Sequence, residues 1–468
     1  MLVRQTALTL ARRGTRTLAT TAIRSHTPLT ETCSSPHFFD AVHKGTIPSF
    51  RLLGPDGVLV KDAEEEWVQR AKGEDGEKLK RMLEVMTMLP ILDQILYSSQ
   101  RQGRISFYMT GYGEEGTVVG SAAAWENDDE VFAQYREVGV LIWRDYPLSS
   151  LMAQVFSTAS DIATKGRQMP VHYGSREHHF HTISSPLGTQ LPQAAGAAYA
   201  LKRTPGRENS CVVCYAGEGA TSEGDFHAGL NSASPERFAA NEADGDVDAV
   251  ASVLGGPLVY VVRPRSFAIS TPVSQQYAGD GIAARGPGYG IETVRVDGND
   301  PLAVYLACKE ARRKAVEGQK PVLVEAMTYR VGHHSTSDDS SAYRSLSAVE
   351  SVKKLDSPIH RLRRYLESLS PALWSAEHDA KIKDESKRAI LREFSKAEKE
   401  KKPQLAEMFG DVFAPVQGEE GQRYGGLERP QYEQKAELKR LIEKWGETQT
   451  WKKELEKFAG GKEAVAKW

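Results

Sequence analysis

The segment Gly217–Asp225 carries glycines, acidic residues and hydroxyl side chains directly after the apolar run Cys211–Ala216. A strand, a glycine turn and a helix N-terminus in succession present backbone N–H groups and a helix dipole to an anion. Glu218, within the turn, offers a carboxylate to a divalent cation that bridges phosphates. Glycines in such a turn also serve tight strand-to-helix packing alone. The segment therefore predicts phosphate binding, and packing alone remains the open alternative.

Two further segments contain side chains that suit a phosphate. Gln134–Glu137 includes Arg136 and is expected to follow a hydrophobic helix, whereas Tyr329–Asp339 includes His334 and follows a predicted strand. Arginine binds phosphate oxygens bidentately, and a neighbouring histidine donates a hydrogen bond or moves a proton. Each segment alone is explained equally well by a surface ion pair. Together with Glu218 they predict a pyrophosphate-binding enzyme site.

The cysteines do not predict a metal site. Cys211 and Cys214 have the spacing of zinc ligands, but no second Cys or Cys/His pair follows them and both lie in an apolar run. A structural zinc site needs that second half. Four cysteines in 468 residues also make no disulfide framework, which favours a reducing compartment.

Short apolar runs alternate with helical patterns along the middle of the chain. Leu258–Val262 and Val322–Glu325 are typical of buried parallel strands, as is Cys211–Ala216. Gln190–Arg203 and Pro301–Glu317 have the pattern of helices between them. This order predicts an α/β fold with a doubly wound, mainly parallel sheet, in which ligands bind at the carboxyl ends of the strands.

Helical periodicity marks the regions on either side of this sheet. Apolar residues at helical spacing predict a long helix over 77–100, and the small residues Ser121–Ala124 suit a helix start. The C-terminal third has the amphipathic patterns of surface helices, at Leu362–Leu369, Ile390–Ala397 and Leu438–Trp445.

Composition excludes some classes of protein. The chain has 60 basic and 62 acidic side chains, a net charge of -2 and 40% hydrophobic residues. This balance is typical of a globular protein and argues against a dedicated nucleic-acid binder, which carries a clustered basic excess. No apolar run approaches the roughly 18 residues that span a bilayer.

The N-terminus has a composition of its own. It contains Arg4, Arg12 and Arg13 among small and hydroxyl residues, and no acidic residue precedes Glu31. This is typical of a mitochondrial transit peptide, predicted over 1–35, and a disordered basic tail is the alternative. The remaining boundaries are expected to be an N-terminal arm and helix over 36–100, a cofactor-binding α/β domain over 101–345 and a helical region over 346–468.

Five segments closely resemble one family, the alpha subunits of mitochondrial branched-chain 2-oxoacid dehydrogenases, which are thiamine diphosphate-dependent decarboxylase components. The resemblance runs from about residue 50 to the C-terminal helices. The paired His333-His334 before a Ser/Asp run is more similar to branched-chain enzymes than to their pyruvate-using relatives. The segments are Arg167–Gly174, Ser184–Gln190, Gly217–Asp225, Gly279–Tyr289 and Gly332–Arg344.

The resemblance implies a set of site residues. His334 is the catalytic candidate and would contact the cofactor from its loop. The cofactor-binding residues would be Gln134, Tyr135, Arg136, Ser185, Leu187, Gly217, Glu218, Gly219, Ala220, Arg263 and His334. Magnesium would be held by Glu218 and the carbonyl of Phe267, and potassium by Ser184, Pro186, Thr189 and Gln190. Ser335 and Ser345 match phosphorylation positions, where added negative charge beside a diphosphate would oppose activity.

The same resemblance implies an activity and partners. The enzyme would decarboxylate branched-chain 2-oxo acids oxidatively in the mitochondrial matrix and acylate a lipoyl group on the acyltransferase of a larger complex. Thiamine diphosphate is the electron sink, so the protein supplies binding, orientation and charge. In this family a beta subunit supplies the glutamate that activates the cofactor. An assembly of two alpha and two beta subunits is therefore implied, and a regulatory kinase and phosphatase are further expected partners.

The chain departs from the family pattern at one place. The family has Arg-Asn-Asn-Gly before its aromatic residue, where this chain has Arg263-Pro264-Arg265-Ser266 before Phe267. Arg265 thus replaces the asparagine that ligates magnesium, and a guanidinium has no acceptor for a hard cation. An acidic insertion at about 234–250 lies nearby.

Three explanations of this departure stay open. Arg265 replaces part of the metal's charge in an active enzyme, the subunit is catalytically weakened, or the stretch is an error in the coding sequence. Two other functions also remain: a pyruvate- or acetoin-type alpha subunit, and a noncatalytic subunit whose metal binding Arg265 impairs.

Overall fold

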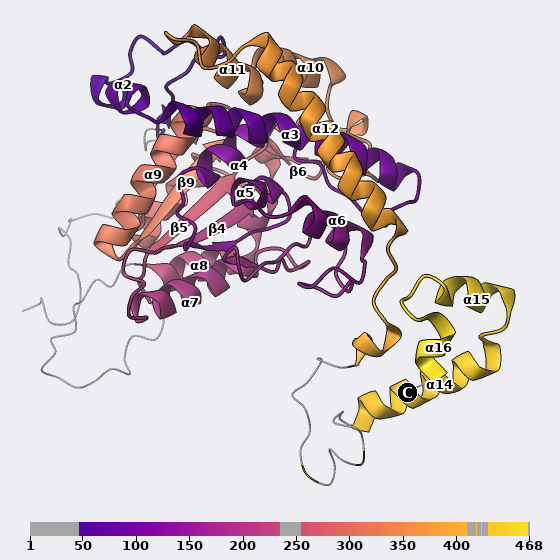
Figure 1. Cartoon of the computed structure of the whole chain (residues 1–468). Coiled ribbons are helices and arrows are strands. Elements are labelled where there is room, and N and C mark those ends of the chain that lie inside the picture. The colour runs from indigo at the N-terminus through magenta and orange to yellow at the C-terminus, as the bar shows by residue number, and fades with distance from the viewer. Residues whose placement is uncertain (1–45, 235–253, 410–417, 419–422, 424–428, 467–468) are drawn as a thin grey trace, which may run out of the picture. The chain divides into compact units, whose positions relative to one another are not determined.

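The computed structural model describes residues 46–234, 254–409, 418, 423 and 429–466 (Figure 1). Residues Ile47–Trp468 form one compact unit. The predicted transit peptide at 1–35 lies outside the described residues, and so does the predicted insertion at 234–250 beyond Ser234.

The centre of this unit is a seven-stranded sheet whose neighbouring strands are all parallel. This confirms the predicted fold class, and the predicted arm contributes an edge strand. Strands β4 and β5 are buried along their whole length, which suits their β-branched residues. The strand order is β1 (Ser49–Phe50), β8 (Glu292–Asp297), β9 (Pro321–Met327), β5 (Leu258–Arg263), β4 (Val212–Gly217), β2 (Glu130–Phe132) and β3 (Phe180–His181).

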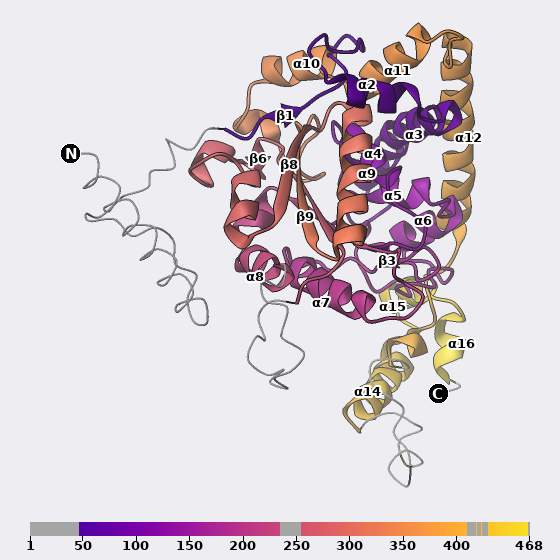
Figure 2. The same ribbon diagram turned by 90° about the vertical axis from the view of Figure 1, so that its left-hand side faces the viewer.

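Helices cover both faces of the sheet (Figures 1 and 2). Helices α4 (Glu115–Ala122) and α9 (Pro301–Gly318) lie on one face, and α7 (Gln190–Lys202) and α8 (Gly224–Ala233) lie on the other. Alternate strand residues enter the two cores: Val213 packs with the first face and Cys214 with the second. Both faces of the sheet are therefore covered by buried apolar side chains.

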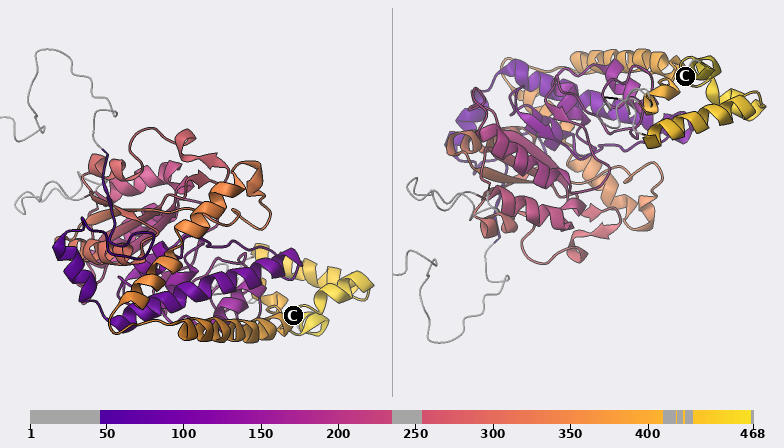
Figure 3. Two further views of the ribbon diagram at one scale, coloured as in Figure 1. Left: turned by 90° about the horizontal axis from the view of Figure 1, so that it is seen from above. Right: turned by 90° about the horizontal axis from the view of Figure 1, so that it is seen from below.

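Helix α3 (Gly76–Arg101) confirms the long helix predicted over 77–100. It begins after Asp75, whose side chain accepts a hydrogen bond from the backbone N–H of Glu77. Helix α12 (Ala376–Lys399) lies beside it (Figure 3). The predicted C-terminal helices are confirmed as α11 (Pro358–Ser368), α12 and α14 (Arg429–Trp445).

Two local expectations are wrong. Gln134–Glu137 follow the short strand β2 rather than a hydrophobic helix. Ser121–Ala124 lie at the end of α4, which begins at Glu115, rather than at a helix start. In both places the apolar run is too short for periodicity to distinguish a strand from a helix or to fix a boundary.

None of the described helices is long and apolar enough to cross a membrane. The remaining α-helices are α2 (Glu65–Lys72), α5 (Val138–Trp143), α6 (Leu148–Phe156), α10 (Leu346–Leu355), α15 (Gln449–Leu455) and α16 (Gly461–Ala466). Strands β6 (Phe267–Ala268) and β7 (Thr271–Pro272) form a separate two-stranded hairpin.

Candidate functional site

Four adjacent strands, β2, β4, β5 and β9, end at the same edge of the sheet. Each of these strands ends at or before a charged residue of the site: Arg136 follows β2, Glu218 follows β4, Arg263 completes β5 and Arg330 follows β9. The register sets Gly217 of β4 opposite Arg263 of β5. Parallel pairing thus gathers residues from segments nearly 200 positions apart, as expected for a ligand site in a doubly wound sheet.

Glu137 fixes the turn after β2. Its Oε2 accepts hydrogen bonds from the backbone N–H groups of Gln134 at 3.1 Å, Tyr135 at 2.8 Å and Arg136 at 2.8 Å. Its Oε1 accepts from the guanidinium of Arg263. The carboxylate thereby connects the ends of β2 and β5 and orients the segment that was predicted to contact the cofactor.

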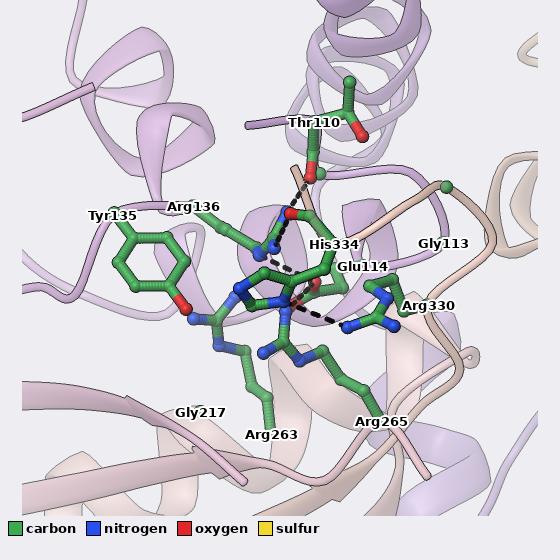
Figure 4. Close-up of polar contacts among 12 residues, drawn as sticks. Thr110, Gly113, Glu114, Tyr135, Arg136, Gly217, Arg263, Arg265, Arg330 and His334 are labelled. Atoms are coloured by element: carbon green, nitrogen blue, oxygen red, sulfur yellow. Dashed lines mark hydrogen bonds and ion pairs between the residues drawn. The ribbon is translucent and has the colours of Figure 1, made fainter. Parts of the chain in front are cut away.

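Glu114 is the second acidic centre of the site and lies directly before α4 (Figure 4). Its carboxylate accepts hydrogen bonds from Arg263 at 2.6 Å and Arg265 at 3.0 Å, and it lies 3.8 Å from Nε of Arg136. Burial alone would raise the pKa of Glu114, but attraction to Arg265, Arg263 and Arg136 outweighs it and lowers the pKa to about 2. Glu114 is therefore charged at neutral pH.

In this cluster, arginines outnumber the carboxylates that form ion pairs with them. Four guanidinium groups lie together, and each residue is at most 3% exposed. In each of them Nε is buried without a hydrogen-bond partner. Glu114 and Glu137 are the carboxylates that ion-pair with Arg136, Arg263 and Arg265. Since buried charges need compensation, the cluster has the capacity to bind an anion. We name Arg136, Arg263, Arg265 and Arg330 the arginine cluster.

His334 lies against the arginine cluster (Figure 4). Its backbone carbonyl accepts a hydrogen bond from Arg136 at 2.6 Å, and its Nδ1 lies 3.1 Å from Nη1 of Arg330. Burial and the charges of Arg136, Arg265 and Arg330 lower the pKa of His334 to about 3. Because guanidinium only donates, Nδ1 is the acceptor and the neutral ring carries its proton on Nε2. His334 thus offers an N–H donor at neutral pH.

Glu218 is engaged by donors. Its Oε2 accepts from the backbone N–H of Arg265 at 2.7 Å, and its Oε1 accepts from the side-chain amide of Gln276. Burial raises the pKa of Glu218. Gly217, the residue before it, donates its N–H to the side chain of Gln134 at 2.6 Å. The turn at the end of β4 is therefore held by hydrogen bonds to its neighbours.

Backbone at this turn comes close to side chains. A Cβ atom on Gly217 would lie 3.2 Å from Nη2 of Arg265, and one on Gly219 would lie 3.1 Å from Cβ of Ala268. Gly217 therefore allows the Arg265 guanidinium to approach the backbone. Ala220 is fully buried beside them, in the same core as α8.

The segment 184–190 precedes and begins α7. Ser185 Oγ lies 2.9 Å from Nε2 of the buried His172, and Leu187 is 39% exposed. Hydroxyl Oγ1 of Thr189 donates to the carbonyl of Pro186 at 3.5 Å. Gln190 donates its amide to the carbonyl of Tyr215, which ties the segment to β4. Ser184, like Ser185, is exposed.

The predicted phosphorylation positions differ in their surroundings. Ser335 is half-buried and follows His334 directly, and its Oγ accepts from the N–H of Ser337 at 3.3 Å. Ser345 is exposed immediately before α10.

Phe267, whose carbonyl was predicted to bind magnesium, lies in β6, where the centroid of its ring is 5.8 Å from that of Tyr343.

Sequence reasoning missed several residues of this site. Glu114 comes from the loop before α4, and its pairing with Arg263 and Arg265 depends on packing across more than 100 residues. An acidic pair, Glu114-Glu115, at the start of a glycine-rich apolar helix was the available signal. Arg330 and Glu137 lay within segments that were noticed, but no role was assigned to either side chain.

Known proteins resemble this chain over most of its length. The family described as "Dehydrogenase E1 component" matches residues 83–406. A human protein named "2-oxoisovalerate dehydrogenase subunit alpha, mitochondrial" is 53% identical over 367 residues, which cover 78% of this chain and 76% of the relative. A Caenorhabditis elegans protein with the same name is 50% identical over 339 residues, covering 72% and 73%. An Arabidopsis thaliana protein named subunit alpha 1 is 45% identical over 368 residues, covering 78% and 72%.

Proposed function

Because the chain belongs to the dehydrogenase E1 component family, we propose that it is the alpha subunit of a mitochondrial branched-chain 2-oxoacid dehydrogenase. The reaction is the oxidative decarboxylation of 2-oxoisovalerate and related 2-oxo acids, in the mitochondrial matrix. The observation that carries this function is the arginine cluster at the ends of adjacent strands, with four buried Nε atoms that lack a hydrogen-bond partner. Such a cluster suits the diphosphate of the cofactor.

The cofactor of the proposal is thiamine diphosphate. When bound, it supplies a nucleophilic carbon and an electron sink for the loss of carbon dioxide. Arg136 and Arg263 bind the diphosphate, and His334 donates its Nε2–H to it. The turn at the end of β4 is formed by Gly217, Glu218, Gly219 and Ala220. The side chain of Gln134 orients this turn by accepting a hydrogen bond from the N–H of Gly217. Tyr135, Ser185 and Leu187 contact the thiamine.

The chain's residues orient the cofactor and exclude water from its diphosphate. Arg136 donates to the carbonyls of Thr110 and His334, so one side chain joins the loop before α4 to the loop after β9. Burial of these groups strengthens each charge-assisted bond to a phosphate oxygen. The glutamate that activates the cofactor comes from another chain, which makes a beta subunit part of the active enzyme.

Further partners belong to this proposal. A beta subunit forms an assembly of two alpha and two beta chains, and a lipoyl-bearing acyltransferase receives the acyl group. A kinase and a phosphatase act on Ser335 and Ser345. The position of Ser335 supports regulation by phosphorylation, because Ser335 is adjacent to His334. A phosphate on Ser335 would place nearly two negative charges beside the arginine cluster.

Potassium is held by oxygens of Ser184, Pro186, Thr189 and Gln190. Support comes from Thr189 Oγ1 and the Pro186 carbonyl, which lie 3.5 Å apart in the segment that Gln190 ties to β4. A cation there stiffens the segment that carries Ser185 and Leu187.

Magnesium is the part of the expected cofactor set that the described residues do not fit. Both carboxylate oxygens of Glu218 already accept from N–H donors, and Arg265 offers no lone pair. Among the residues that the structure describes, no group of three His, Cys, Asp or Glu side chains suits a metal ion. The magnesium ligands expected from the resemblance, Glu218 and the carbonyl of Phe267, stay untested, and the donors around Glu218 count against them.

The activity is tested with the chain co-expressed with a beta subunit. Decarboxylation of 2-oxoisovalerate and pyruvate is measured with an artificial electron acceptor. We expect kcat/KM to favour 2-oxoisovalerate by at least about tenfold, since even one methylene contributes about 10- to 200-fold. A preference for pyruvate would instead indicate the pyruvate- or acetoin-type subunit.

Two variants complete this test. Arg263→Gln is expected to reduce cofactor binding, whereas Arg203→Asn, at an exposed position after α7, leaves activity unchanged. A wild-type assembly that forms stably and binds no thiamine diphosphate would refute the enzymatic function and favour the noncatalytic subunit.

A further inference from the structure

Arg265 lies where the family pattern has a metal-ligating asparagine. The residue is 3% exposed, and its Nη2 is 3.2 Å from the position of a Cβ atom on Gly217. Its guanidinium therefore lies against the glycine turn at the end of β4, the backbone proposed to approach the diphosphate (Figure 4). The charge of the side chain is directed into the site rather than toward solvent.

Glu218 is arranged to accept N–H donors. The backbone N–H of Arg265 and the amide of Gln276 donate to its two carboxylate oxygens. Magnesium demands near-octahedral oxygen coordination at about 2.0–2.1 Å. A guanidinium cannot supply such a ligand, and its charge repels a divalent cation placed beside it.

Arg265 also has binding capacity that the protein does not use. Its Nη1 donates to Glu114 at 3.0 Å, but Glu114 also accepts from Arg263 and so does not neutralise Arg265 alone. Nε of Arg265 is buried without a hydrogen-bond partner. A side chain that is 97% buried and carries an unpartnered donor requires an acceptor for its full stabilisation.

From this geometry we infer that the chain binds the diphosphate of its cofactor without a divalent cation, because the guanidinium of Arg265 takes the cation's place. The inference rests on the proposed function, since it concerns the same diphosphate. Guanidinium matches two phosphate oxygens with parallel N–H donors, and Arg330 adds a second buried positive charge nearby. The side chain of Arg265 thus stands in the position of the ligand, and its single positive charge replaces part of the charge of the metal ion.

Calorimetric titration of the assembled alpha and beta subunits with thiamine diphosphate tests this inference. The titration is carried out once in EDTA and once in excess magnesium chloride. We expect the two Kd values to agree within about threefold, a difference of less than about 1 kcal/mol. Binding in magnesium that is lost in EDTA would overturn the inference but leave the proposed function standing. Absence of binding in both buffers would overturn both.

Variants of Arg265 separate its role from that of its neighbours. Arg265→Asn is expected to weaken binding in EDTA by about 10- to 100-fold, the effect of a lost charge-assisted hydrogen bond. Magnesium is expected to restore most of that affinity, because the asparagine supplies an oxygen ligand. The matched variant Arg330→Gln removes another buried arginine of the cluster, and its loss of affinity should be the same in both buffers.

Two further measurements cover the case in which Arg265→Asn does not fold. Arg265→Lys keeps the charge but not the bidentate geometry, so binding is expected to weaken and yet to stay equal in EDTA and in magnesium. The wild-type assembly is also titrated with Mn²⁺ and followed by electron paramagnetic resonance in the presence of thiamine diphosphate. Tight Mn²⁺ binding at one site for each alpha chain would refute the replacement of the cation.

Discussion

Replacing Glu114 by Gln is expected to destabilise the protein when no cofactor is bound. The change keeps the shape of the side chain but removes the charge that Arg263 and Arg265 share at 2.6 and 3.0 Å. Burial opposes the charged carboxylate, yet the arginines lower its pKa from 4.5 to about 2. Since one pKa unit corresponds to about 1.4 kcal/mol, this shift favours the charged form by about 3 kcal/mol more in the folded than in the unfolded protein.

This energy agrees with the cost of breaking a buried ion pair, about 3–5 kcal/mol. For a large domain it corresponds to a fall in melting temperature of roughly 5 °C. Thiamine diphosphate should compensate, because its negative charge replaces the missing carboxylate. The increase in melting temperature on adding the cofactor should therefore be larger for Glu114→Gln than for the wild type.

The pH dependence provides an independent check. The folded pKa of Glu114 is depressed, so its contribution is complete above pH 4.5 and is lost as pH falls from 4.5 toward about 2. The difference in stability between wild type and Glu114→Gln should shrink in that window.

Differential scanning calorimetry of the alpha–beta assembly measures these effects, with Glu317→Gln as a control. Glu317 is an exposed carboxylate paired with Arg313, so its loss should shift melting by less than about 2 °C. The reasoning would be refuted if Glu114→Gln melted like the wild type, or if its deficit did not change with pH.

Three further predictions concern the loops around the site. Because burial and the neighbouring arginines lower the pKa of His334 to about 3, its neutral form contributes stability above pH 6.5 that is lost as pH falls toward 3. His334→Asn should lessen this acid sensitivity in melting curves between pH 6.5 and 4, and an unchanged profile would contradict it. Ser335→Glu should weaken thiamine diphosphate binding by at least about tenfold in calorimetry. Ser345→Glu, at an exposed position, should change the affinity by less than about threefold. Equal effects of the two variants would argue that the distance of the added charge from the arginine cluster does not matter. Thr189→Val should remove the stabilisation of the assembly by KCl relative to NaCl, and a preserved difference would count against the potassium site.

The fold could be predicted because its signals are local. The apolar runs at 211–216, 258–262 and 322–325 became β4, β5 and β9, since β-branched runs that alternate with helices favour buried parallel strands. The errors occurred where local signal is weak. Strand β2 has three residues, and the helix before Ser121 is rich in glycine and valine, which have low helix propensity.

The sequence by itself determined the fold class and the family, because residue type and periodicity carry that information. Residue types also pointed to Arg136, Glu218 and His334, and the family resemblance added Arg263. Only the tertiary structure decided which charges meet. Glu114 pairs with Arg263 across 149 positions and with Arg265 across 151, and His334 contacts Arg136 across 198. The sequence identified Arg265 as a departure from the family pattern, and only the packing showed that its guanidinium points into the site, toward Glu114 and Gly217. Coulombic and hydrogen-bond energies depend on distance and burial in space, which the order of residues along a chain does not specify.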